Sequence, residues 1–245
     1  MDHIHAFEQS AELQGQSRFN IYAIIHKAIR LFMTDTLVAV GNMDCNDAAK
    51  KAKVLDQVRE LAATCRSHFL HENEFIHPVM EARRPGSTTQ VAAEHGHHAW
   101  AINRLEEMTA AVERAQGDAR QDAANALYRY LALFVAENFV HMNVEETANN
   151  AVLWATHTDA ELIGIEQAIV ASQTPEEAMS VMRWMMQAMN AGERAEMLHG
   201  IRQHAPEPVF DAVLALAKNH LPSSEWGKLT KALAAPAREV AQAAA

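Results

Sequence analysis

Apolar residues recur at steps of three and four along four long stretches in the first two thirds of the chain. This spacing gathers them on one face of a helix, and none of the stretches alternates as a strand would. Gly41 is expected to end the first helix, Pro78 the second, and the turn sequence RRPGSTT lies before the third. The predicted helices cover roughly 17–40, 47–77, 88–115 and 120–154. Long helices with short connections pack as antiparallel neighbours, so we expect an all-α fold, an up-down-up-down four-helix bundle.

Shorter helical segments follow the bundle. Thr158 and Glu161 form a capping-box pattern, and Thr174 followed by Pro175 marks the next helix start. We therefore predict a bundle domain over residues 1–155 and a C-terminal, all-helical extension over residues 156–245. The extension is expected to pack on the bundle or to contact a partner protein or a second copy of the chain.

Histidines and glutamates interrupt the apolar face of the long helices. The inward positions, in chain order, are His26, His68, Glu72, His95, His98, His141 and Glu145. Burying so many imidazoles and two carboxylates without a cation would be very costly, so the pattern predicts a metal site inside the bundle.

A repeat organises these candidate ligands. His26 precedes a His68-x-x-x-Glu72 pair by 42 residues, and His98 precedes a His141-x-x-x-Glu145 pair by 43 residues. Residues four apart lie on one helix face, so each pair can bind one metal ion or bridge two metal ions. Imidazole and carboxylate ligands without thiolate suit iron, manganese or zinc, and two bridging carboxylates favour a dinuclear centre, for which we expect iron.

Four segments then carry a resemblance: IIHKAIR, HFLHENEFIHP, EHGHHAW and HMNVEE, between residue 17 and about residue 154. Their ordered pattern resembles the hemerythrin, or HHE cation-binding, family. The resemblance implies a non-haem centre of two iron ions, with an oxo or hydroxo bridge expected. It implies that His26, His68 and His141 are terminal ligands and that Glu72 and Glu145 are the bridges.

The third and fourth helices leave alternatives open. The repeat spacing favours His98, whereas the Glu-His start of its segment favours His95, and both residues share one helix face. Two histidines here would resemble the dioxygen carriers of the family, and one would resemble the four-histidine relatives linked to repair of iron centres. The second bridge is Glu145 or Glu146, and Glu145 mirrors Glu72.

A ferritin-like di-iron protein is an alternative. Glu74 with His77, and Glu94 with His97, have the Glu-x-x-His spacing of that class. The class also needs a glutamate on each of two other helices, and segment 17–40 contains none, which disfavours it. We expect these side chains to line the solvent-accessible end of the bundle or to orient ligating imidazoles.

The net charge and the cysteines indicate which partners and which cellular compartment to expect. The formal charge of −10 argues against nucleic acid or an anionic membrane as partner, and no apolar run reaches the ~18 residues of a membrane span. Cys45 and Cys65 make no Cys-x-x-Cys pair, and the N-terminal sequence MDHIHAFEQS lacks a signal-peptide pattern. We therefore expect a cytoplasmic protein.

The expected function is reversible binding of dioxygen or nitric oxide, for sensing, storage or scavenging, rather than catalysis. Tyr22 is the only possible proton donor on the inward faces, and a phenol is a weak acid. The alternatives are an iron-handling or redox enzyme, which repairs iron centres or reduces peroxide or nitric oxide, and an interaction module in which the metal only stabilises the bundle.

Overall fold

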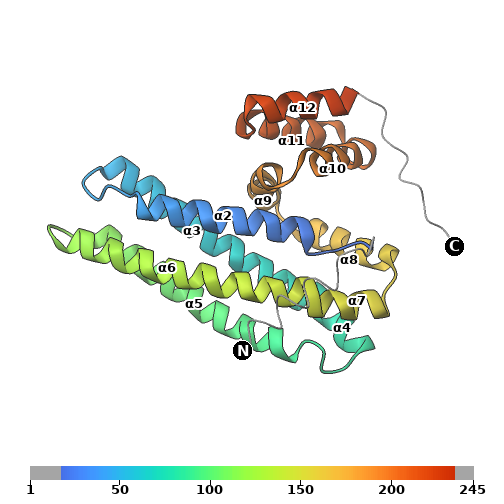
Figure 1. Ribbon diagram of the computed structural model, residues 1–245, viewed down its shortest axis with the longest axis horizontal. Helices are drawn as coiled ribbons and strands as arrows, with labels where there is room; N and C mark the ends of the chain where they lie inside the picture. The colour runs from blue at the N-terminus through green and yellow to red at the C-terminus, as the bar shows by residue number, and fades with distance from the viewer. Residues whose placement is uncertain (1–17, 235–245) are drawn as a thin grey trace. The chain divides into compact units, whose positions relative to one another are not determined.

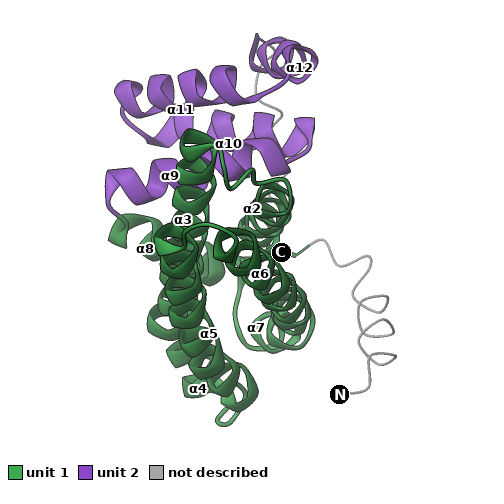
Figure 2. Cartoon of the chain, turned by 90° about the vertical axis from the view of Figure 1, so that its left-hand side faces the viewer, with its two compact units in different colours: residues 1–173 green, residues 174–245 purple. Residues whose placement is uncertain are grey.

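The computed structural model describes residues 18–234, and within this range all regular structure is helical, without a strand (Figure 1). The predicted all-α class is therefore confirmed. Two compact units divide between Gln173 and Thr174, as the two colours of Figure 2 show. The first unit thus includes one helix that the sequence pattern assigned to the extension. Residues 1–17 and 235–245 of the predicted domains lie outside the described residues.

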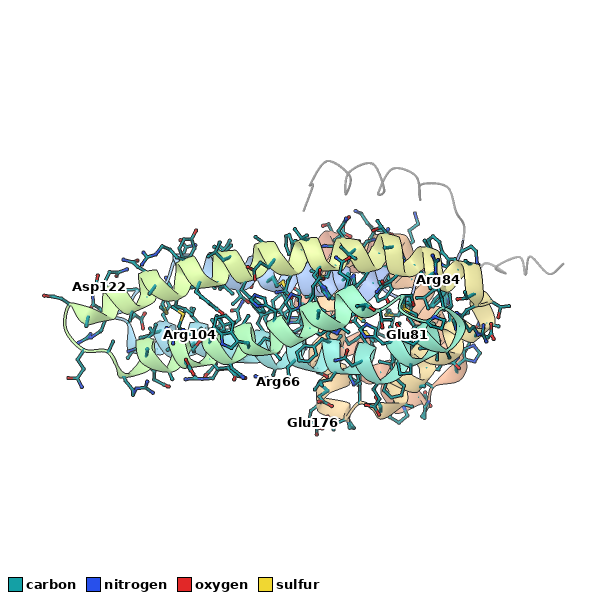
Figure 3. All side chains as sticks on the ribbon, turned by 90° about the horizontal axis from the view of Figure 1, so that it is seen from below. Arg66, Glu81, Arg84, Arg104, Asp122 and Glu176 are labelled. Atoms are coloured by element: carbon teal, nitrogen blue, oxygen red, sulfur yellow. The ribbon has the colours of Figure 1, made fainter. Side chains whose placement is uncertain are left out.

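Four long helices form the body of the first unit. They are α2 (Ala23–Gly41), α3 (Ala48–His71), α5 (Thr89–Arg114) and α6 (Ala119–Val144). Helix α2 contacts α3 and α6, and α5 contacts the same two helices, so each helix lies beside its chain neighbours around one core. The fully buried residues of this core include Phe32, Met33, Leu55, Leu61, Ile102, Leu105, Leu127 and Leu131. Charged residues such as Arg66, Arg104 and Asp122 lie on the outer surface (Figure 3).

A π-helix extends both α3 and α6. η1 (Glu72–Ile76) leads into α4 (His77–Arg83), and η2 (Glu145–Asn149) leads into α7 (Asn150–Thr156). The prediction that Pro78 ends the second helix is therefore wrong, because the helical run continues to Arg83. Pro78 stands in the first turn of α4, directly after the π-helix, where a residue without an N–H donor is tolerated.

Helix α8 (Asp159–Ser172) covers one end of the first unit and contacts η1. It begins with the predicted capping box of Thr158 and Glu161. Leu162 of α8 is fully buried in an apolar cluster with Tyr22 and Ile76. This cluster separates the bundle interior from solvent at that end.

The second unit consists of α9 (Pro175–Ala188), α10 (Ala191–His204), α11 (Glu207–His220) and α12 (Ser223–Ala234). From α8 onward the helices begin at residues 159, 175, 191, 207 and 223, a constant step of 16 residues. Helix α9 packs with α11, and α10 packs with α11 and α12, so alternate helices lie side by side. The constant step and the regular packing are those of a short helical repeat, which was not predicted from the sequence.

Among the described residues, none of the helices combines the length and the apolar character that crossing a bilayer requires.

Candidate metal centre

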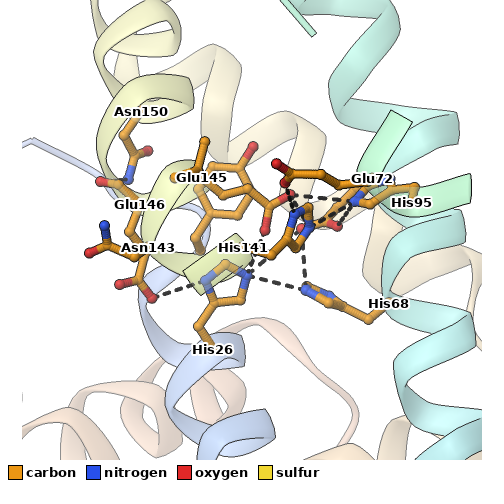
Figure 4. Close-up of polar contacts among 12 residues, drawn as sticks. His26, His68, Glu72, His95, His141, Asn143, Glu145, Glu146 and Asn150 are labelled. Atoms are coloured by element: carbon orange, nitrogen blue, oxygen red, sulfur yellow. Dashed lines mark hydrogen bonds and ion pairs between the residues drawn. The ribbon is translucent and has the colours of Figure 1, made fainter. Parts of the chain in front are cut away.

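Six of the predicted residues meet inside the bundle. His26 comes from α2, His68 from α3, His95 from α5 and His141 from α6, while Glu72 and Glu145 are the first residues of the two π-helices (Figure 4). Five of them are buried, and the His68 side chain retains 17% of its exposure. π-helical turns occur frequently at functional sites, and here each one begins at a carboxylate of the cluster.

The six side chains form two groups that share both carboxylates. The first group is His26, His68, Glu72 and Glu145, and the second is Glu72, His95, His141 and Glu145. In each group, one ligand atom from every residue lies within 4.8 Å of the others. The Nε2 atoms of His26 and His68 are 3.2 Å apart, and those of His95 and His141 are 3.0 Å apart. Each group therefore offers two imidazoles and two carboxylates to one position.

Each carboxylate faces both groups with different oxygens. Oε1 of Glu72 lies 3.2 Å from His68 Nε2, and its Oε2 lies 3.4 Å from His95 Nε2. Oε1 of Glu145 lies 3.3 Å from His141 Nε2, and its Oε2 lies 3.5 Å from His26 Nε2. Both glutamates are thus placed to bridge two cations.

The electrostatics of the cluster fit cations. All four carboxylate oxygens of Glu72 and Glu145 are buried without a hydrogen-bond partner, which is a costly state unless positive charge compensates them. Burial opposes ionisation, yet His68, His26 and His95 hold the pKa of Glu72 well below its usual value. Burial and Glu72 likewise oppose ionisation of Glu145, but His141 and His95 lower its pKa to about 2. Nitrogen and oxygen donors without thiolate suit iron, manganese or zinc.

Three imidazoles are held from behind by hydrogen bonds from their Nδ1 atoms. His26 bonds to Glu146 at 2.9 Å, His95 to Asn73 at 2.8 Å and His141 to Glu94 at 2.7 Å. Since carboxylate and amide oxygens accept, each Nδ1 carries a proton, and the Nε2 atoms face the centre, where they could bind a metal. The two Nε2 atoms of each pair lie about 3 Å apart, a distance at which they can share one proton or be bridged by one cation.

These outer partners were only partly predicted. Glu146 lies outside both groups and bonds to His26 and Arg30, so the structure separates its position from that of Glu145. The bond of Glu94 to His141 agrees with the expectation that this carboxylate orients an imidazole, whereas the contact of Asn73 with His95 was not predicted. Their signal is local, because Glu94 immediately precedes His95, and Asn73 immediately follows Glu72.

His98 is buried but belongs to neither group. Its ring packs edge-on against the His141 ring, with centroids 4.5 Å apart. Burial, together with His141 and His95, lowers the pKa of His98 to about 4, so the side chain is neutral. The structure therefore brings His95, and not His98, together with the other candidate ligands.

The two Glu-x-x-His pairs that suggested a ferritin-like protein do not meet at one site. His77 is buried and its ring stacks on His95 at 5.0 Å, whereas His97 is exposed and pairs with Glu137. Glu94 bonds to His141, and Glu74 is exposed. Within residues 18–234 none of these four belongs to a group that could hold a metal.

Tyr22 lies against the centre on the side covered by α8. Its ring stacks on that of His26 with centroids 5.2 Å apart, and the side chain is 1% exposed. Burial and the nearby carboxylates of Glu145 and Glu72 raise the pKa of Tyr22 well above its ordinary value. The phenol therefore keeps its proton at neutral pH.

A small cavity of about 10 Å³ lies next to the ligands, towards the middle of the bundle. Its apolar lining consists of Ile29, Cys65, Phe69, Ile102 and Met142, and its other walls are His68, Glu72, His98, Asn138 and His141. This volume is about the minimum that holds one water-sized molecule. The centre thus combines charged donors with an apolar space for a very small ligand.

Comparison with known protein families shows a match to a metal-binding family. The sequence model of the hemerythrin HHE cation binding domain matches residues 21–162, a range that contains both ligand groups. No curated protein and no solved structure matches the chain. The match covers more than half of the chain and agrees with the helical bundle and with the placement of the histidines and glutamates. The chain therefore belongs to the hemerythrin HHE cation-binding family.

Proposed function

We propose that the two ligand groups hold two iron ions and that this centre reversibly binds dioxygen or nitric oxide. The observation that carries the proposal is the sharing of Glu72 and Glu145 by both groups, with all four of their oxygens free of hydrogen bonds. Two positive ions compensate two buried carboxylates better than one ion does. His26 and His68 would hold one ion, and His95 and His141 the other.

Iron in such a site would supply an open coordination position and redox chemistry for a diatomic ligand. The residues around the open coordination position support the binding of a diatomic ligand. Half of the side chains that line the cavity beside His68 and His141 are apolar, and the cavity is too small for anything much larger than a diatomic molecule. Exclusion of water protects a bound gas from side reactions, which favours release of the ligand unchanged.

The hydrogen bonds behind the imidazoles support the proposal in a second way. Glu146, Asn73 and Glu94 fix three ring orientations, so the donor atoms keep their places whether or not a ligand is bound. Tyr22 holds its proton tightly, which limits proton transfer to a bound ligand. Both features favour binding over turnover.

The decisive measurement is metal content together with the visible absorption spectrum of the reduced, iron-loaded protein under anaerobic conditions. We expect two irons per chain, a new band on addition of dioxygen or nitric oxide, and loss of that band when the gas is removed. His68→Ala should lower the iron content and weaken the band, whereas His204→Ala, in the second unit, should change neither. About one zinc per chain, with no response to either gas, would contradict the proposal.

A second candidate function is iron handling or redox catalysis, including repair of iron centres. The observation that favours it is that four imidazoles, not five, gather around the carboxylates. This set leaves each ion with two histidines and makes both positions comparably open. Transfer of iron from the loaded protein to an iron-free acceptor protein, faster than its release to buffer, would favour this candidate over gas binding.

A further inference from the structure

The buried centre needs a route by which a cation or a small ligand can reach it. Glu72, His95 and Glu145 are at most 2% exposed, and His26 is fully buried. The end of the bundle beyond Tyr22 is closed by the apolar cluster around Leu162 of α8. Access must therefore come from the side of the bundle or through its interior.

A surface groove between α5 and α6 reaches the centre from the side. It has a volume of about 580 Å³ and a mostly apolar surface, and Ala93, Ala136 and Val140 lie in its walls beside His97 and Glu137. Glu94, His98 and His141 line it as well. The last two also line the small cavity beside the ligands. One layer of two imidazoles therefore separates the groove from the cavity.

These two imidazoles are held differently. His141 donates from Nδ1 to Glu94 and directs Nε2 at Glu145, so moving it would break the centre. His98 makes no hydrogen bond to any residue that the structure describes, and ring contacts with His141 and His95 keep it in place. Rotation of His98 therefore costs packing contacts only, and it would open the cavity to the groove.

We infer that the groove between α5 and α6 is the access route to the centre and that His98 is the movable partition between groove and cavity. The inference rests on the proposed function, in which the two groups hold metal ions. The chemistry of the groove walls suits the passage of both a diatomic gas and a metal cation. Apolar walls admit a neutral diatomic gas, and the half-buried carboxylate of Glu94, bonded to His141, attracts a divalent cation towards the centre.

The test uses Co²⁺ as the probe, because its visible absorption reports binding in the folded, full-length protein. Ala93→Trp and Ala136→Trp place an indole at exposed groove positions, where it can block the route without entering the core. Ala92→Trp is the matched control, since residue 92 is exposed on the same helix but does not line the groove. His98→Ala removes the partition.

Two quantities are measured for each variant: the Co²⁺ content at saturation, and the rates of Co²⁺ uptake and of release to EDTA. Both blocking variants should slow uptake and release about tenfold, which corresponds to ~1.4 kcal/mol added to each barrier, at unchanged content. His98→Ala should accelerate both rates about tenfold, also at unchanged content, and Ala92→Trp should match the wild type.

Different results would contradict the dinuclear metal centre and the access route. A Co²⁺ content of one per chain would contradict the dinuclear centre, while the rates would still test the route. Wild-type rates in both blocking variants would overturn the groove as the route. A reduced content in His98→Ala, with circular dichroism showing an intact fold, would make His98 a ligand and overturn its role as a partition.

Discussion

The first ligand group, with His26 and His68, and the second, with His95 and His141, contain the same residue types around shared carboxylates. Their outer contacts differ. Glu146, which holds His26, is itself paired with Arg30, whereas the only other hydrogen bond that the structure describes to Glu94, which holds His141, comes from the neutral amide of Gln90. The second position therefore keeps more uncompensated negative charge, and we expect it to bind a cation more tightly.

Two groups with the same inner residue types can therefore differ in the affinity that we expect for a metal ion. Hydrogen bonds behind an imidazole raise its basicity and fix its orientation, and the charge of the acceptor decides how strongly. The His68 side chain is also the most exposed of the four histidines in the two groups, at 17%. Both features make the first position the more labile one.

The largest expected effect comes from removing what the two groups share. Glu72→Gln should abolish both metal positions, because this carboxylate faces both groups. With metal at about a thousandfold excess over the dissociation constant of each position, the wild type should gain about 4 kcal/mol in free energy of unfolding for each ion bound, and the variant close to nothing. Chemical denaturation with and without metal measures this, and retention of one full equivalent would contradict the sharing.

Removing one histidine should affect one group only. We expect His68→Ala and His95→Ala each to keep about one metal ion per chain, because the other group retains two imidazoles and both carboxylates. The ion kept by His68→Ala should be the tighter of the two in a chelator competition. Equal affinities in the two variants would show that the outer contacts do not distinguish the positions.

Smaller changes should come from the outer carboxylates. Glu94→Gln should weaken the second position by about 10–100-fold, the usual range for residues behind a metal ligand. Glu146→Gln should weaken the first position less, since Arg30 already offsets the charge of Glu146. Metal titrations followed by calorimetry give both affinities, and the reverse order would contradict the charge argument.

The pH dependence of the metal-free protein should depend on two of the buried histidines. Burial lowers the pKa of His68 to about 4, whereas Glu145 and Glu94 overcome burial and raise that of His141 to about 10. Stability should therefore fall as the pH drops from about 6.5 to 4, where only unfolded chains protonate His68. It should also fall as the pH rises from about 6.5 to 10, where His141 loses a proton that only the folded state retains.

The slope from either residue is at most ~1.4 kcal/mol per pH unit. Urea unfolding of the metal-free wild type, His68→Gln and His141→Gln over this range separates the two contributions. His68→Gln should flatten the acid limb alone, and His141→Gln should flatten the alkaline limb alone.

Much of the fold followed from the sequence, because apolar spacing and short turns determine helices and their antiparallel order. The four long helices, the capping box at Thr158 and the helix start at Thr174 agree with expectation. The π-helices could not be predicted, since an i→i+5 turn leaves no distinct spacing in one sequence. The 16-residue step was visible in principle, but its positions vary too much in residue type to stand out.

The choice between His95 and His98 shows a limit of reasoning from spacing. The repeat of 42 and 43 residues favoured His98, yet His95 joins the group, 46 residues before His141. The reason is helix length: α5 and α6 have 26 residues each, whereas α2 has 19 and α3 has 24. A longer hairpin places residues at the same height further apart in the chain.

The shared carboxylates make each half of the bundle dependent on the other. The hairpin that supplies His26, His68 and Glu72 lacks Glu145, and the hairpin with His95, His141 and Glu145 lacks Glu72. The connection between them runs from α4 to α5 through the exposed residues Arg84–Gly86. A chain severed at this connection would give two fragments with incomplete sites. Metal would then act as the ligand that drives fragment complementation, and reassembly of the fragments would report metal concentration directly.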